Sequence, residues 1–160
     1  MPTFHVQIAG QATGADGKQI QVPAGLALQQ RGPVLQVSVG LEHNMAQALI
    51  QQGKPVPSMK VGLALIDTGA TISCIDEQAA KDMKLPVVDV GQMTSASHVG
   101  HPCNLYPIQI VLPAGIAFGA PRAMGANLAS QGLIAIIGRD ILQVCTMFYN
   151  GVAGQITLSL

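Results

Sequence analysis

Alternation of apolar and polar residues, which is typical of half-buried β-strands, recurs along this chain of 160 residues. It is clearest in residues 4–8, 34–39 and 155–160, and Leu35, Val37 and Val39 fall on one face. Residues 61–66 are instead apolar without interruption, which predicts a strand buried on both faces. The pattern as a whole predicts a mostly β protein.

Turn and hairpin signals add detail to this prediction. The Gly- and Asp-containing segment 14–17 precedes residues 19–22, which we interpret as the returning strand of an N-terminal hairpin. Strand-forming residues 87–90 and 107–112 flank the polar segment 92–105, a pattern typical of a hairpin with a polar tip.

Helical signals are few and short. Residues 41–52 carry Leu41, Met45, Ala48 and Leu49 on one helical stripe, and the stripe ends before Gly53. Asp76 is placed to cap a short helix that runs to Met83. Residues 113–131 are rich in Gly and Ala, and we expect a loop with at most one helical turn.

Composition excludes some classes of function. Eight basic residues balance eight acidic ones, so no nucleic-acid partner is expected. No segment is apolar enough to cross a membrane, no signal peptide is visible, and three widely spaced cysteines favour a reducing compartment, so we expect a cytoplasmic protein. A length of 160 residues suits one domain. The chain is 49% hydrophobic and 10% charged, and this apolar composition favours a homo-oligomer.

Asp67-Thr68-Gly69-Ala70 follows the apolar strand 61–66, and Ile136-Ile137-Gly138-Arg139-Asp140 ends a second apolar run. This pair of motifs resembles the retropepsin-like aspartic proteases. The resemblance covers residues 33–160 and implies a mostly β closed barrel with a flap hairpin and two or three short helices. Residues 1–30 then form an N-terminal extension, which we expect to be a hairpin.

The chemistry of this family needs two carboxylates that share one proton, one to activate a water and one to polarise the scissile carbonyl. The chain contains one Asp-Thr-Gly, and no other Asp ends an apolar strand in the same way. A homodimer in which each protomer contributes Asp67 would supply the pair. The resemblance implies an endopeptidase that acts on polypeptides, without a metal or other cofactor.

The resemblance also implies roles for the residues around Asp67. Thr68 would bond across the dimer axis, Gly138 would permit close packing, and Arg139 would support the catalytic loop. Retroviral members carry an acidic residue at the position of Thr71, which leaves the expected contact of Arg139 open. The residues expected to bind substrate are Gly69, Ala70, Thr71 and Ile137, together with Ser97, His98 and Val99 of the flap.

Other interpretations of the same residues remain open. The chain could be an inactive peptide-binding or dimerisation module with the same fold, or a maturation protease that removes its own N-terminal segment. His98, His101 and Cys103 invite a metal site, but no fourth ligand is apparent. Cys103 could be a nucleophile beside a histidine, but no third group that would orient the histidine is apparent.

Overall fold

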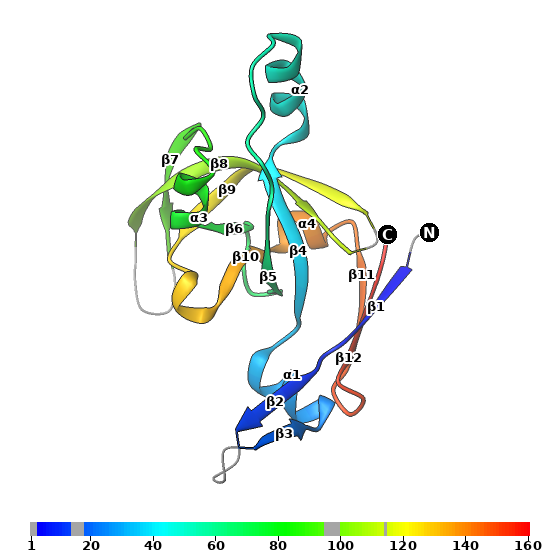
Figure 1. Cartoon of the computed structure of the whole chain (residues 1–160). Coiled ribbons are helices and arrows are strands. Elements are labelled where there is room, and N and C mark those ends of the chain that lie inside the picture. Colours follow the sequence, from blue (N-terminus) through cyan, green and yellow to red (C-terminus); the bar gives the residue numbers. More distant parts are fainter. Residues whose placement is uncertain (1–2, 14–17, 95–99, 114) are drawn as a thin grey trace.

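The computed structural model describes residues 3–13, 18–94, 100–113 and 115–160. Its main sheet consists of β4 (Val34–Leu41), β5 (Lys60–Ile66), β6 (Cys74–Asp76), β7 (Asp89–Met93), β8 (His101–Val111), β9 (Ala117–Ala126) and β10 (Leu133–Ile137). The strand order is β4-β5-β10-β6-β9-β8-β7, and pairing of β4 with β8 closes the first six strands into a barrel (Figure 1). The expected mostly β closed barrel with a few short helices is confirmed.

The apolar strand β5 lies between β4, to which it is antiparallel, and β10, to which it is parallel. Its second half enters the core, where Ala64 and Ile66 are buried. Val61, near the start of the strand, is 62% exposed, so the expectation of burial on both faces was wrong for this end. The buried end is the one that leads into Asp67.

β9 is the main error of the sequence prediction, because residues 113–131 were expected to form a loop. Ten of these residues form a strand that pairs with β8 and β6, and only the 3-10 turn η1 (Ala129–Gln131) fits the expectation. Gly119 and Pro121 are poor strand formers. The register with β8 shifts between Tyr106, which lies opposite Ala123, and Ile108, which lies opposite Ala120. Pro121, which cannot donate a ladder hydrogen bond, falls within this irregularity.

The expected flap hairpin consists of β7 and β8, which pair from Asp89 opposite Leu105 to Met93 opposite His101. The sequence placed the first of these strands at 87–90, and the structure places it two residues later. Residues 95–99 at the expected tip lie outside the described residues.

A second sheet joins the two ends of the chain. It consists of β1 (Thr3–Gln7), β12 (Gln155–Ser159) and β11 (Thr146–Asn150) in the order β1-β12-β11. The N-terminal hairpin forms between β2 (Gly10–Thr13) and β3 (Gln19–Val22), not between β3 and residues 4–8, because those residues pair with β12.

The N-terminal segment is more than a hairpin, since it continues into α1 (Ala24–Arg31), a helix that we did not predict. Ile8, Ala27 and Leu28 are buried and share one apolar cluster with residues of the barrel. Gly32 ends the helix at φ +71°, a conformation that favours glycine.

Of the remaining helices, α2 (His43–Gln51) projects from one end of the barrel, whereas α3 (Glu77–Asp82) and α4 (Arg139–Leu142) lie against it (Figure 1). The predicted stripe of α2 is only partly covered: Leu41, before the helix, is buried, and Leu49 is half-buried against the core, but no residue of the helix is fully buried. Within the described residues, no helix is long and apolar enough to cross a membrane.

Candidate active site

The Asp67 loop (residues 67–71) begins where the parallel strands β5 and β10 end. The Asp67 N–H donates to the carbonyl oxygen of Ile137 at 2.9 Å, which ties the loop to the neighbouring strand. Within the loop, the Gly69 N–H donates to Oδ1 of Asp67 at 2.8 Å. A Cβ on Gly69 would lie 3.0 Å from that oxygen, so a glycine suits this close approach. The half-buried carboxylate is thereby held in one orientation.

The first residues of α4 hold the Asp67 loop through backbone and side chain. The Arg139 N–H donates to the carbonyl of Ala70 at 2.9 Å. The guanidinium donates to the carbonyls of Thr68 at 2.8 Å and Gly69 at 3.1 Å. It also donates to Oγ1 of Thr71 at 2.8 Å. The contact of Arg139 with position 71, which the sequence left open, is therefore made to a hydroxyl instead of a carboxylate. One planar, five-donor side chain thus contacts three residues of the loop.

A buried polar group that the sequence analysis did not identify joins β6 to α4. Ser73 has an exposed fraction of 0%; its hydroxyl donates to Oδ1 of Asp140 at 2.7 Å and accepts the Gly138 N–H at 3.0 Å. The Ser73 N–H also donates to both oxygens of Asp140, each at 3.0 Å. A Cβ on Gly138 would lie 2.8 Å from the carbonyl carbon of Ile72, so the two segments touch at backbone level.

The cysteines near this site are not poised as nucleophiles. Burial, and then the nearby Cys103, Asp140 and Asp67, raise the pKa of Cys74 to about 11. Burial also raises the pKa of the Cys103 thiol. Because the thiolate is the reactive form, these thiols are largely unreactive at neutral pH, which argues against Cys103 as a nucleophile.

The structure gives mixed support to the expected substrate contacts. Gly69 and Thr71 are exposed and Ala70 is half-buried beside Asp67. Ile137 is 2% exposed and packs in the core, so its side chain is not available to a substrate in this chain. Its neighbour Ile136 is half-buried and packs on Cys74, Leu128 and Leu133. Ser97, His98 and Val99 lie outside the described residues.

The metal alternative depends on His98 and therefore also lies outside the described residues. Among the residues that the structure describes, no group of three His, Cys, Asp or Glu side chains could hold a metal ion.

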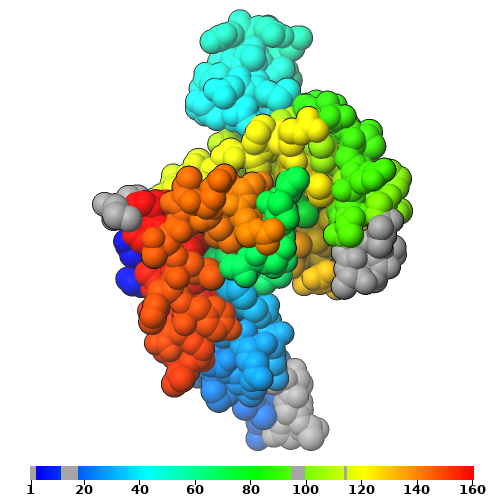
Figure 2. Space-filling view, turned by 180° about the vertical axis from the view of Figure 1, so that it is seen from behind, coloured from blue at the N-terminus to red at the C-terminus, as the bar shows by residue number. Residues whose placement is uncertain are grey.

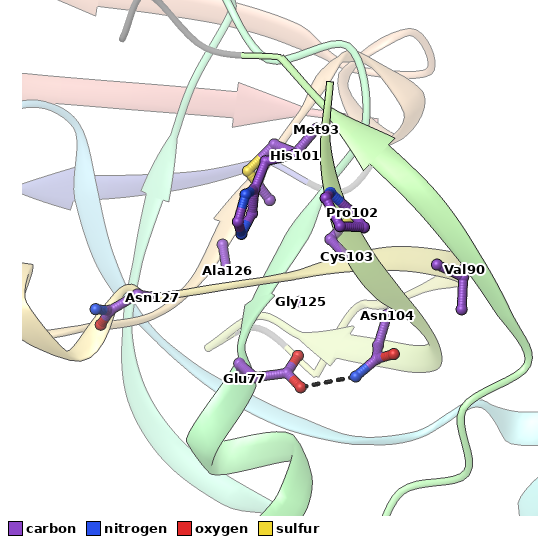
Figure 3. Close-up of a pocket in the computed structure, with 10 residues that line it drawn as sticks. All are labelled: Glu77, Val90, Met93, His101, Pro102, Cys103, Asn104, Gly125, Ala126 and Asn127. Atoms are coloured by element: carbon purple, nitrogen blue, oxygen red, sulfur yellow. Dashed lines mark hydrogen bonds between the residues drawn. The ribbon is translucent and has the colours of Figure 1, made fainter. Parts of the chain in front are cut away.

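A cavity of about 580 Å³ lies between the flap hairpin, the end of β9 and α3 (Figure 3). Glu77 accepts hydrogen bonds from Asn104 and from the Tyr106 hydroxyl, both at 2.9 Å. Burial would raise the pKa of Glu77, but these bonds and the nearby Lys81 hold that pKa below its usual range. No residue of the Asp67 loop lines this cavity. Its lining residues are Glu77, Val90, Met93, His101, Pro102, Cys103, Asn104, Gly125, Ala126 and Asn127.

Comparison with known proteins adds one remote likeness. No family model and no curated protein matches the sequence. Among solved structures, the chain is similar to a retropepsin-like aspartic protease from Rickettsia conorii. The two share 13% sequence identity and a TM-score of 0.44, over 98% of this chain and 91% of that one. What this chain does must therefore be inferred from its own site.

Proposed function

We propose that this chain is the protomer of an aspartic endopeptidase, in which Asp67 of two copies forms one catalytic pair. The observation that carries the proposal is the anchoring of the Asp67 loop: Arg139 contacts Thr68, Gly69 and Thr71, and α4 also binds the loop through its backbone. Such anchoring suits a carboxylate that has to be held in a defined place and orientation.

In the proposed mechanism, two Asp67 carboxyl groups share one proton, because two like charges so close together cannot both ionise. The ionised carboxylate takes a proton from a water molecule, which attacks the scissile carbonyl carbon. The protonated carboxyl donates a hydrogen bond to the carbonyl oxygen, and the amine then leaves with a proton.

The remaining residues of the loop would position the substrate. Thr68 would bond across the dimer axis, and the Gly69 carbonyl would accept a substrate N–H with the lone pair that Arg139 leaves available. Ala70 and Thr71 would line the floor, and flap residues Ser97, His98 and Val99 would cover an extended peptide.

The test is cleavage of a diverse peptide library between pH 4 and 7.5 by the wild type, Asp67→Asn and Asp82→Asn. Asp82 is an exposed carboxylate on α3 that pairs with Lys60, so its variant controls for the loss of one negative charge. We expect cleavage that is lost in Asp67→Asn and kept in Asp82→Asn. A folded wild type that cleaves no peptide would favour an inactive binding or dimerisation module, and cleavage by Asp67→Asn would overturn the assignment of Asp67.

A further inference from the structure

The C-terminal strand β12 already has a partner on each side within one chain. It pairs with β1 from Thr3 opposite Ser159 to Gln7 opposite Gln155. On its other side it pairs with β11, from Thr146 opposite Ser159 to Asn150 opposite Gln155. A second copy therefore cannot add a strand to β12 without breaking existing pairs, and the open edges of the described sheet are those of β1 and β11.

The edge of β11 is the more apolar of the two. Phe148 is 63% exposed, and Tyr149 and the adjacent Val144 are also exposed. β1 exposes no large apolar side chain, since Phe4 and Val6 are half-buried against the core. β11 contains no charged residue. An exposed, uncharged strand edge with apolar side chains is a template for pairing with another strand.

The same edge is connected to the active site by a short link. β11 starts four residues after the end of α4, and the Cys145 N–H bonds back to the Leu142 carbonyl at 2.9 Å. The first residue of α4 holds the Asp67 loop through the Arg139 contacts. Figure 2 shows the orange segment that contains α4 and β11 on the same face as the green segment that contains the loop. A partner bound at β11 would thus lie on the face of the molecule that carries the Asp67 loop.

We propose that two copies of this chain pair through the edges of β11, antiparallel about a two-fold axis. The two three-stranded sheets would become one six-stranded sheet with the order β1-β12-β11-β11-β12-β1. This inference rests on the proposed function, because the need for a second Asp67 is what calls for another copy. A two-fold axis at β11 keeps the assembly closed at two subunits, and in each of them α4 connects the β11 edge to the Asp67 loop.

The sheet itself provides a matched control for a charge test. Thr3, Ser159 and Thr146 form one row across the three strands, and His5, Thr157 and Phe148 form another. The variant Thr146→Lys/Phe148→Lys therefore places two lysines on the β11 edge, and Thr3→Lys/His5→Lys places two in the same rows on the β1 edge. Each isologous contact occurs twice in a two-fold dimer, and like charges opposite each other are unfavourable.

Sedimentation velocity across a dilution series measures the dimer dissociation constant of each variant. We expect the β11 variant to weaken the dimer about ten-fold or more, and the β1 variant to leave it unchanged. Equal dimer strength in the β11 variant, equal weakening by the β1 variant, or a monomeric wild type at every concentration would overturn the inference. Circular dichroism checks that both variants are folded.

Cysteine cross-linking provides a second test that needs no disruptive charge. In an antiparallel pair about a two-fold axis, one residue lies opposite its own copy. In a Cys145→Ala background, single cysteines placed at each position from 146 to 150 should therefore cross-link most strongly at one position. A cysteine at position 3 should not cross-link. A dimeric sample that cross-links at none of the five β11 positions would contradict the inference.

The two proposals can fail separately. A dimer that depends on β11 but cleaves no peptide supports the interface and refutes the protease. Cleavage that requires Asp67, together with a β11 variant of unchanged mass and activity, supports the protease and overturns the interface.

Discussion

Replacing Ser73 with alanine should destabilise the chain at the point where the Asp67 loop meets α4. The hydroxyl donates to Asp140 and accepts from Gly138, and Ser73 has an exposed fraction of 0%. Removing it leaves the buried Gly138 N–H unpaired, which costs about 1–3 kcal/mol. The lost bond to a charged group adds to this, but Asp140 keeps its bonds from the N–H groups of Ser73 and Ile141.

We therefore expect the free energy of unfolding to fall by about 2–4 kcal/mol. For a chain of this size, that corresponds to a decrease in Tm of roughly 5–15 °C. Urea unfolding followed by circular dichroism measures the first quantity, and calorimetry measures the second. Protein concentration has to be equal in all samples, because the proposed dimerisation would make apparent stability depend on concentration.

Ser38→Ala is the matched control, since Ser38 is half-buried on β4. It should change stability by less than about 0.5 kcal/mol. A Ser73→Ala variant as stable as Ser38→Ala would refute the view that the Ser73–Asp140 contact holds the two motifs together. A destabilised Ser73→Ala variant with full peptidase activity would show that the contact serves folding and not the placement of Asp67.

Three further predictions concern neighbouring groups. Asp76→Ala should lower the free energy of unfolding by about 3 kcal/mol or more, because the buried Asp76 carboxylate accepts three backbone N–H bonds. Asp76→Asn keeps one acceptor oxygen, so it should lower the free energy of unfolding by less in the same urea assay. Arg139→Lys should reduce peptidase activity about ten- to a hundred-fold, because an ammonium group cannot span the three acceptors of the loop, and an unchanged kcat/KM would contradict the positioning role. The pKa of Glu77 is lowered in the folded chain. Its contribution to stability is therefore present above pH 4.5, its ordinary pKa, and is lost as the pH falls towards the folded value. A Glu77→Gln variant with the same decline of Tm between pH 6 and pH 3 as the wild type would exclude Glu77 as a source of that decline.

The local patterns that the sequence predicted well are those in which one short segment determines its own structure. Asp76 is followed by helix-forming residues, and it caps α3 by accepting the Ala79 N–H, as its position indicates. The alternation in residues 34–39 places Leu35, Val37 and Val39 in the core, because a strand has a side-chain period of two. The motif pair around Asp67 and Arg139 likewise directed attention to two segments that the structure brings into contact.

The errors fall where a neighbour in space decides the outcome. Residues 117–126 contain poor strand formers, yet they form a strand because β8 and β6 supply hydrogen-bonding partners on both sides. The stripe on residues 41–52 predicts a helix correctly but not its burial, since periodicity does not say whether another element covers the face. Ser73 showed no signal in the sequence, because its partner Asp140 lies 67 residues away.

The sequence by itself determined the β-rich character of the chain, the helices α2 and α3, and the one carboxylate that follows an apolar strand before a glycine loop. These features depend on periodicity and on residue types next to each other. Only the tertiary structure decided that Arg139 reaches the hydroxyl of Thr71, that Ser73 meets Asp140, and that β12 is enclosed by β1 and β11. These features depend on long-range pairing, whose energy comes from contacts between segments that the linear order keeps apart.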